Sequence, residues 1–304
     1  MEVARVEAIA VERVEAVESA GAPSRAADLL ELTKPRITGL VLITAAVGYA
    51  VGTGASFETA RFLLFMAGTG LLCAGASALN QYMERDADAR MRRTCRRPIP
   101  AGRIRPEEAL VFGLALSALG LAALAPVNAL TLTLGAISLV SYVLAYTPLK
   151  RVTSLCTVVG AVPGALPPLM GWTAARGVLG PAGWGLFAIL FLWQLPHFLA
   201  IGWLYRDDYA RGGFPMLAVT DSDGSSTGRQ ALLYAAALLP VTLAAGLLAG
   251  AGNAYLWGAL AIGGAFLGCA AGFAWKRSTG AARRLFFASV LYLPLLLGLM
   301  VFAR

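Results

Sequence analysis

The chain has 304 residues, of which 58% are apolar and only 14% are charged, with a formal net charge of +8. A soluble domain carries nearer to a quarter charged residues, so this composition excludes an ordinary soluble enzyme. The apolar residues also lie in long unbroken runs, and a run of about 20 such residues spans a bilayer as a helix. The composition therefore predicts an all-α polytopic membrane protein.

The first 30 residues precede the first apolar run and are predicted to form a cytoplasmic tail, either disordered or folded as an amphipathic helix. This stretch carries five Glu before residue 20 and lacks a continuous apolar segment. A secretory signal peptide instead combines a basic start with an apolar core, so we do not expect one here. Residues 31–304 are assigned to one transmembrane domain.

Nine apolar segments follow in chain order, and each is predicted to form a transmembrane helix. They cover residues 37–55, 62–83, 108–125, 128–146, 154–174, 182–204, 230–250, 254–274 and 285–303. The loops between them are too short to hold a separate soluble domain, and no clear repeat relates the two halves of the chain.

Lys and Arg are distributed unevenly over the loops between these segments. If the N-terminus is cytoplasmic, 22 of the 25 Lys and Arg fall on the cytoplasmic side, and the exceptions are Arg61, Arg176 and Arg304. Cytoplasmic loops are enriched in basic residues, so this asymmetry supports nine spans with the C-terminus on the opposite side. The positive charge then reflects membrane topology, and no nucleic-acid partner is expected.

The four cysteines are Cys73, Cys95, Cys156 and Cys269. They show no CxxC spacing and mostly lie inside apolar runs, which argues against a disulfide framework and against a zinc site. We expect them to be small buried side chains.

The end of the second segment carries polar side chains that topology does not explain. Asn80, Glu84 and Asp88 are spaced four residues apart, so on a helix they share one face. Their oxygen atoms suit a hard cation such as Mg²⁺, which commonly bridges carboxylates to substrate phosphates. The arginines between residues 90 and 97 could bind phosphate as bidentate forks. The alternative is a solvated loop with weak local ion pairs.

A second acidic pair, Asp207 and Asp208, follows the sixth segment on the same predicted side of the membrane. Two carboxylate groups facing each other across a bundle could hold a metal and a diphosphate, while basic side chains stabilise the leaving group. Lys150 and Arg151 also lie on this side, where Lys150 could reach a phosphate or, with Arg151, only mark the cytoplasmic face. A polar loop with a Gly-Gly turn is the alternative for the acidic pair.

His197 is the only histidine in the chain and lies inside the sixth segment, next to Pro196. An ionisable side chain in a membrane span is costly, so it starts as a functional hypothesis. Imidazole can ligate haem iron or transfer protons, and a buried histidine can also be purely structural. The sequence leaves these three alternatives open.

Several stretches together resemble the protoheme IX farnesyltransferases, or haem O synthases, within the UbiA superfamily of intramembrane prenyltransferases. They are NQYMERDADARMRRTCRRPIPAGRI, YTPLKRVTS, VGAVPGALPPLMGWTA, WQLPHF and RDDYARGGFPML. The two acidic motifs indicate only the superfamily. The PHF, GALPPLMGW and DDYARGGFPML stretches are more specific and point to the haem branch. The resemblance extends over residues 31–304 in order and spacing.

The resemblance implies nine transmembrane helices around a central cavity that opens to lipid. It implies transfer of the farnesyl group of farnesyl diphosphate to a vinyl group of haem b, with addition of water, giving haem O and diphosphate for terminal oxidases. Haem is then a substrate, and Mg²⁺ is the expected cofactor. The expected location is the inner (cytoplasmic) membrane, and a haem A synthase is a candidate partner.

The resemblance also implies roles for individual residues. The metal ligands are expected to be Asn80, Glu84, Asp88, Asp207 and Asp208. The diphosphate-binding residues are expected to be Asn80, Arg93, Arg97, Lys150 and Arg151. Asp88, Lys150, His197 and Asp208 are the candidate catalytic residues, with His197 on the haem side. Two positions depart from the family pattern: Glu84 stands where many members have Asp, and Cys156 where Asn is frequent.

Two other functions share part of these features. A prenyltransferase acting on a quinone or chlorophyll-type acceptor would keep both acidic clusters, but the PHF and GALPPLMGW stretches argue against it by resemblance. A transporter of an anionic metabolite would be expected to show a symmetric repeat with binding groups at mid-membrane. Here the charges gather at one membrane face, which favours the enzyme.

Overall fold

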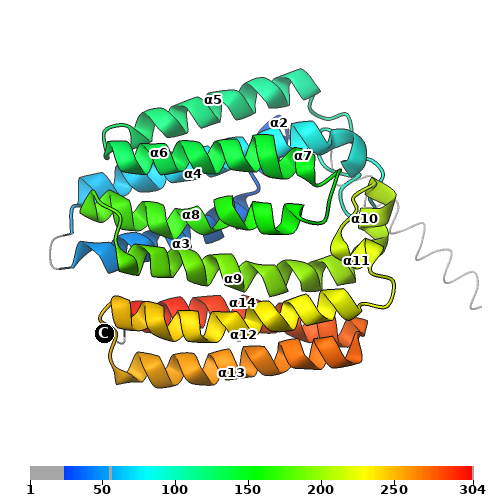
Figure 1. Cartoon of the computed structure of the whole chain (residues 1–304). Coiled ribbons are helices and arrows are strands. Elements are labelled where there is room, and N and C mark those ends of the chain that lie inside the picture. The colour runs from blue at the N-terminus through cyan, green and yellow to red at the C-terminus, as the bar shows by residue number, and fades with distance from the viewer. Residues whose placement is uncertain (1–23, 55–56, 303–304) are drawn as a thin grey trace, which may run out of the picture.

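A computed structural model of the chain describes residues 24–54 and 57–302, which fold into helices joined by short turns (Figure 1). Within these residues, nine helices are long and apolar enough to cross a membrane. The prediction of an all-α polytopic fold with nine spans is thereby confirmed. Most of the predicted tail, up to residue 23, lies outside the described residues, and its last part belongs to the short helix α2 (Arg25–Leu32).

The spanning helices run roughly alongside one another (Figure 1). They are α3 (Pro35–Thr53), α4 (Thr59–Asp88), α5 (Pro106–Leu124), α6 (Ala129–Val140) continued by η1 (Ser141–Tyr146) and α7 (Thr147–Leu149), α8 (Cys156–Arg176), α9 (Pro181–Leu204), α12 (Ser225–Leu248), α13 (Asn253–Lys276) and α14 (Thr279–Phe302). The short helices α10 (Arg206–Gly212) and α11 (Leu217–Thr220) lie together at one end of the bundle, which we call the polar end, and α2 packs against α4.

Proline marks both the beginnings and the irregular interiors of these helices. Pro35, Pro106 and Pro181 stand in the first turn of a helix, where the missing N–H group costs nothing. Inside α8, Pro163 and its neighbours remove backbone donors, and side chains of other helices bind to this stretch. Ser138 Oγ of α6, for example, donates at 3.4 Å to the backbone oxygen of Pro163, whose helical donor would have been the N–H that Pro167 lacks. Such satisfaction of backbone groups is what a hydrocarbon environment requires.

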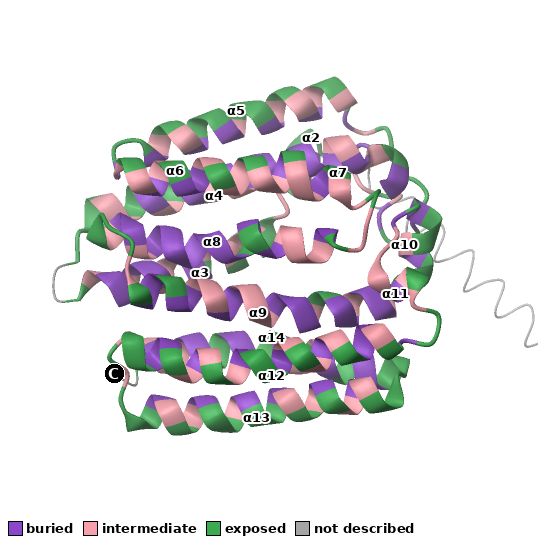
Figure 2. Cartoon of the chain, viewed as in Figure 1, coloured by how far each residue is buried: buried purple, intermediate pink, exposed green. Residues whose placement is uncertain are grey.

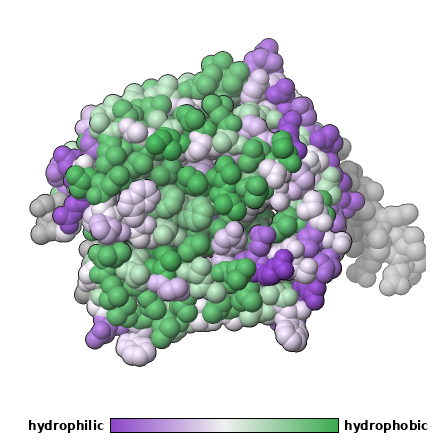
Figure 3. Space-filling model, in the orientation of Figure 1, coloured by the Kyte–Doolittle hydropathy of each residue, from purple (hydrophilic) through white to green (hydrophobic). Residues whose placement is uncertain are grey.

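Buried side chains face the interior of the bundle, and α8 near its centre is buried on most sides (Figure 2). One core cluster joins α9, α12, α13 and α14, and a second joins α3, α4, α6 and α8. Hydrophilic side chains gather towards the two ends of the molecule, whereas the flank between them is largely apolar (Figure 3). This distribution is that of a protein whose flank faces lipid.

The helix α4 extends to Asp88, past the predicted end of the second segment at residue 83. The charged residues that follow the apolar run therefore continue the helix rather than forming a loop. The turn that follows, residues 89–105, folds back over the end of α4 before α5 begins.

The helices α3 and α8 approach closely at two glycines. A Cβ atom at Gly48 would lie 1.9 Å from the backbone oxygen of Pro168, and one at Gly171 would lie 2.1 Å from the backbone oxygen of Ala45. Small residues at membrane helix interfaces allow this kind of backbone contact.

Replacement of Gly48 by alanine is expected to separate α3 from α8. Overpacking of a tight contact costs about 1–3 kcal/mol, so the unfolding temperature of Gly48→Ala in detergent should fall below that of the wild type. Gly39→Ala is the matched control, because a Cβ at Gly39 on the same helix meets no atom within 4 Å. Equal unfolding temperatures for Gly48→Ala and the wild type would contradict the close approach.

Candidate active site

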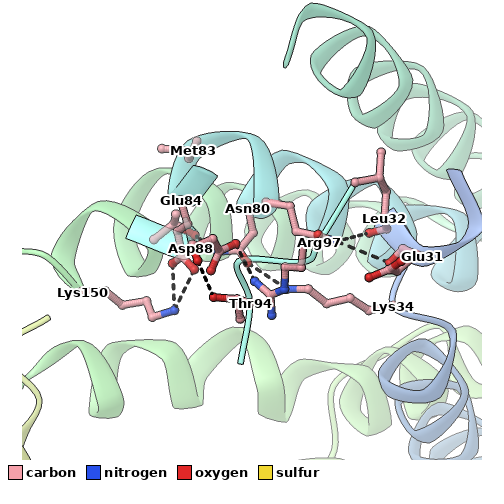
Figure 4. A network of polar contacts seen from close by, with 12 residues as sticks. Glu31, Leu32, Lys34, Asn80, Met83, Glu84, Asp88, Thr94, Arg97 and Lys150 are labelled. Atoms are coloured by element: carbon pink, nitrogen blue, oxygen red, sulfur yellow. Dashed lines mark hydrogen bonds and ion pairs between the residues drawn. The ribbon is translucent and has the colours of Figure 1, made fainter. Parts of the chain in front are cut away.

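The three polar residues predicted at the end of α4 share one buried face at the polar end (Figure 4). Asn80, Glu84 and Asp88 are 2%, 3% and 0% exposed. Burial of this kind is costly for carboxylates unless each is paired or hydrogen-bonded. The partners of these three side chains, described next, come from three other parts of the chain, and we call the whole set the ionic cluster.

Glu84 is paired with Lys150, which follows α7. Lys150 Nζ lies 2.8 Å and 3.0 Å from the two carboxylate oxygens of Glu84, and both side chains are largely buried. The same ammonium group faces the rings of Tyr146 and Phe214 at 5.3 Å and 5.1 Å from their centroids. Burial would lower the pKa of Lys150, but the Tyr146 phenol and the Glu84 carboxylate hold it well above its usual value. Lys150 is therefore a fixed positive charge.

Asp88 is paired with Arg97 of the turn that follows α4. Arg97 Nη1 donates to Asp88 Oδ2 at 2.6 Å, and Thr94 Oγ1 donates to the backbone oxygen of Asp88 at 2.9 Å. The second carboxylate oxygen, Oδ1, is buried and has no hydrogen-bond partner. A buried carboxylate oxygen without a donor is suited to accept a cation or a water molecule.

Asn80 is paired with Lys34, which the sequence did not single out. Lys34 Nζ donates to Asn80 Oδ1 at 2.9 Å, and Asn80 Nδ2 donates to Thr147 Oγ1 at 3.2 Å. Lys34 directly precedes Pro35 and has a left-handed backbone conformation, with φ of 48°. Burial and the nearby Arg97 guanidinium lower the pKa of Lys34 to about 7. Lys34 directly precedes the proline that begins a membrane helix, and this position is the sequence feature by which it could have been identified.

The backbone before Lys34 is held in place by α2. Arg103 binds Asp28 at 2.8 Å and Glu31 at 3.4 Å, while Gln81 Nε2 donates to the backbone oxygen of Leu32 at 3.0 Å. These contacts tie α2 both to α4 and to the turn after it. The orientation of Lys34 is therefore fixed from both sides.

The second acidic pair is split by the structure. Asp208, on α10, is 8% exposed and accepts hydrogen bonds from Arg211 and from the backbone N–H of Arg92. Burial would raise the pKa of Asp208, but these donors hold it below its usual value. The side chain of Asp207 is 85% exposed, with its nearest cation, Arg206, at 3.9 Å. The structure thus joins Asp208, and not Asp207, to the turn that covers the ionic cluster.

Two predicted diphosphate-binding residues lie apart from the ionic cluster. Arg93 is exposed and its guanidinium faces the rings of Tyr205 and Tyr209, at 4.9 Å and 5.7 Å from their centroids. Arg151 is also exposed and donates to the backbone oxygen of Met83 at 2.8 Å. Of the predicted basic residues, Arg97 and Lys150 contact the acidic side chains directly.

His197 lies between α9 and α14. Its Nδ1 is 2.6 Å from Ser289 Oγ, and its ring stacks on Trp193 and Phe286 with centroids 5.1 Å and 5.2 Å away. Its described contacts include none of the residues of the ionic cluster. The structure therefore does not bring His197 together with the predicted metal ligands.

A cavity of about 50 Å³ adjoins the ionic cluster, and we call it the tyrosine cavity. Tyr146, whose ring faces Lys150, lines one part of it, and Tyr209, next to Asp208, lines another. Other lining residues come from α8, α9 and α11 and are mainly apolar. The six-residue π-helix η1 ends at Tyr146, and such irregular turns frequently mark functional sites.

The donor set of the ionic cluster fits a divalent cation. It offers two carboxylates and an amide oxygen on one helix face, and Asp88 Oδ1 is already free of partners. Hard cations such as Mg²⁺ prefer oxygen ligands of this type. Within residues 24–54 and 57–302, three or more His, Cys, Asp or Glu side chains do not converge on one point, so a metal here would share its ligands with a substrate or with water.

Residues 41–291 match the sequence model of the UbiA prenyltransferase family. The chain belongs to this family. Its curated UbiA relatives include the protoheme IX farnesyltransferase of Solibacter usitatus, 47% identical over 91% of this chain and 98% of that protein. The protoheme IX farnesyltransferase of Myxococcus xanthus is 46% identical over 89% and 92% of the two chains.

Solved structures support the same UbiA fold. A digeranylgeranylglyceryl phosphate synthase superposes with a TM-score of 0.78 and 17% identity, covering 91% of this chain and 97% of that one. A UbiA homologue from Archaeoglobus fulgidus, bound to GPP and Mg²⁺, gives a TM-score of 0.65 at 16% identity, covering 90% and 99%. The predicted UbiA-type architecture is confirmed.

Replacement of Lys150 by methionine is expected to leave the buried Glu84 carboxylate without a cation. Breaking a buried pair from one side costs about 3–5 kcal/mol, so the unfolding free energy of Lys150→Met should fall by that order. Adding Glu84→Gln to the Lys150→Met chain should restore most of the lost unfolding free energy. The wild type, the two single variants and the double variant form a double-mutant cycle, whose free energies are measured by thermal unfolding. Arg105→Met, at an exposed ion pair, is the control that should not change stability. Additive losses in the cycle would contradict the pairing.

Proposed function

We propose that the chain transfers the farnesyl group of farnesyl diphosphate to a vinyl group of haem b, with addition of water, to give haem O and diphosphate. The single observation that supports a diphosphate-dependent reaction is the ionic cluster. In it, Lys34, Arg97 and Lys150 contact buried oxygen atoms that are potential metal ligands. The choice of acceptor rests on relatives named protoheme IX farnesyltransferase that are 42–47% identical over most of this chain.

The residues proposed to hold Mg²⁺ are Asn80, Glu84 and Asp88 on α4, with Asp208 approaching from α10. The buried Asp88 Oδ1, which lacks a partner, supports this assignment. A solved UbiA homologue that carries both GPP and Mg²⁺ supports it further. When bound, the metal would neutralise charge on the diphosphate and so promote its departure. Asp207 was predicted as a ligand as well, but its exposed side chain gives that assignment no support.

The cations of the ionic cluster are proposed to bind the diphosphate. Without substrate, Lys150 and Arg97 neutralise Glu84 and Asp88, and Lys34 donates to Asn80. A metal at the carboxylates would release these cations towards the phosphate oxygens, and Arg97 could then act as a bidentate donor. Arg93 and Arg151 stay predictions, with positions at the edge of the site that suit steering of an anionic substrate.

The reaction proceeds by heterolysis of the allylic C–O bond, whose electron pair leaves with the diphosphate. The vinyl π-bond of haem then attacks the allylic carbon, and water adds to the resulting cation with loss of a proton to solvent or a base. The chain's contribution is to orient both substrates and to exclude water until the C–C bond forms. The aromatic face of Tyr146 can stabilise the allylic cation. His197 stays a prediction as a haem-side residue.

The polar end is proposed to face the cytoplasm, with the chain in the inner membrane and its C-terminus on the other side. The basic loops at this end support that orientation. Farnesyl diphosphate would then enter from the cytoplasm, and the prenylated haem would leave towards lipid. An enzyme that oxidises haem O, such as a haem A synthase, is proposed as a consumer of the product.

Product analysis tests the proposed reaction. Membranes that lack this activity of their own, loaded with the chain, haem b, farnesyl diphosphate and Mg²⁺, are expected to yield a new haem heavier by one farnesyl group plus one water. The product should be absent when the metal is chelated, and extracted haems can be resolved by chromatography and mass spectrometry. Unchanged haem b together with prenylation of a quinone precursor would overturn the assigned acceptor.

The two neighbouring aspartates of α10 offer a matched pair of variants. Asp208→Asn, like Asp88→Asn, is expected to reduce turnover at least about a hundredfold, because each removes a negatively charged ligand proposed to hold the Mg²⁺ that would neutralise the diphosphate. Asp207→Asn should leave turnover near the wild-type value. All three proteins should retain the wild-type elution profile in detergent. Equal loss in Asp207→Asn and Asp208→Asn would contradict the assignment of Asp208 alone.

A further inference from the structure

A second cavity of about 50 Å³ lies beside the tyrosine cavity, and the proposed reaction gives it no role. We call it the α12 cavity. It is enclosed by the start of α8, by α9, by α11 and by α12. Thr157, Leu199 and Leu217 line both cavities. The two cavities therefore lie side by side with part of their walls in common, the tyrosine cavity next to Tyr146 and the α12 cavity against α12.

Three polar side chains line the α12 cavity without being used by the fold. Ser154, Gln230 and Tyr234 are partly buried, and in the described part of the chain their side chains make no hydrogen bond. The buried Gln194 and Tyr255 are instead used by the fold: Gln194 donates to the backbone oxygen of Ala161, and Tyr255 donates to that of Thr242. Because Ser154, Gln230 and Tyr234 line the cavity and the fold does not use their polar atoms, these groups are available to a ligand.

The electrostatic surroundings of the α12 cavity favour an anion. Residues 154–158, at the N-terminus of the long helix α8, form one wall, and the N-cap residue Leu155 supplies no side-chain acceptor. The lining contains no carboxylate. The acids of the loop before α12 are engaged elsewhere, Asp221 with Thr227 and Asp223 with Ser225. A helix N-terminus attracts negative charge, and the adjacent amide and hydroxyl groups can donate to it.

We propose, resting on the function proposed above, that the α12 cavity binds a carboxylate of the prenyl acceptor. Haem b carries its vinyl groups and its two propionates towards opposite edges of a flat macrocycle. With a vinyl group in the tyrosine cavity, beside the departing diphosphate, a propionate extends towards α12. Gln230 and Tyr234 donate to this carboxylate and so select which edge of the porphyrin meets the farnesyl group.

The size of the acceptor requires a movement on binding. A porphyrin is larger than both cavities together, and Leu217 lines both of them. Leu217 begins α11, a helix of only four residues between two turns. Outward displacement of α11 is the smallest rearrangement that joins the two cavities into one space.

The test compares porphyrins with free and esterified carboxylates. Wild-type protein in phosphatidylcholine nanodiscs is titrated with protoporphyrin IX and with its dimethyl ester, and binding is followed by quenching of tryptophan fluorescence. The free acid is expected to bind about tenfold more tightly, because the ester loses charge-assisted hydrogen bonds. Tyr234→Phe and Gln230→Leu should bring this ratio towards one and leave the KM for farnesyl diphosphate unchanged. Tyr82→Phe, which removes the same hydroxyl on α4, should keep the wild-type ratio.

Three results would overturn the carboxylate site. The wild type could bind the acid and the ester with equal affinity, or the variants could lose affinity for both porphyrins by the same factor. The preference of the wild type for the free acid could also disappear when phosphatidylglycerol is added. The last result would assign the cavity to a lipid headgroup. Failure of the proposed reaction would look different. The wild-type protein would then produce no farnesylated haem but would still bind the free acid more tightly than the ester. In that case the carboxylate site would be supported and the prenyl transfer would not.

Discussion

The pairing of buried carboxylates with lysine and arginine at the end of α4 is the constraint on which the rest of the site depends. Glu84 and Asp88 lie where water is scarce, so each must face a cation. Arg97 faces Asp88, Lys150 faces Glu84, and Lys34 donates to the neighbouring Asn80. These three basic residues belong to three different connections between helices. The paths of those connections are therefore dictated by charge neutralisation. The same arrangement leaves a cluster in which a metal can exchange places with the cations.

The surrounding structure keeps these cations in place. The turn after α4 is fixed at one side by Arg103, which binds α2, and at the other by Arg90, which donates to the backbone oxygen of Gly212 at the end of α10. Lys150 is packed between two aromatic rings. A polar cluster at a membrane boundary is rigid only when such contacts surround it, and a rigid cluster is what stabilisation of a leaving group requires.

Most of the fold could be predicted from the sequence, because long apolar runs and the distribution of basic residues depend on the bilayer alone. The apolar segment was bounded at residue 83, whereas the helix continues to Asp88, as the spacing of Asn80, Glu84 and Asp88 indicated, because ion pairs from other connections neutralise its charged end. The π-helix η1 and the short helices α10 and α11 leave no comparable signal. They depend on tertiary packing rather than on local pattern.

The site was predictable where helical spacing decides, as for Asn80, Glu84 and Asp88. The resemblance favoured Asp208 over Asp207 as a catalytic residue, but the residue pattern alone could not separate them. Neighbouring residues on a short helix face different directions, and only the packing of α10 shows which is inside. The residue pattern could not separate Arg97 from Arg93 for the same reason. Lys34 was missed because its role depends on a left-handed backbone residue that turns the chain towards α4.

The ionic cluster combines residues 34, 80–88, 97 and 150, so it is complete only after four spanning helices have entered the membrane, and Asp208 follows two helices later. During synthesis the acidic end of α4 emerges well before the segments that carry Lys150 and Asp208. Contacts so distant in sequence form late in folding. Glu84 therefore lacks its cation until the fourth spanning segment is synthesised, and a chain truncated before Lys150 displays an unpaired carboxylate at the membrane surface.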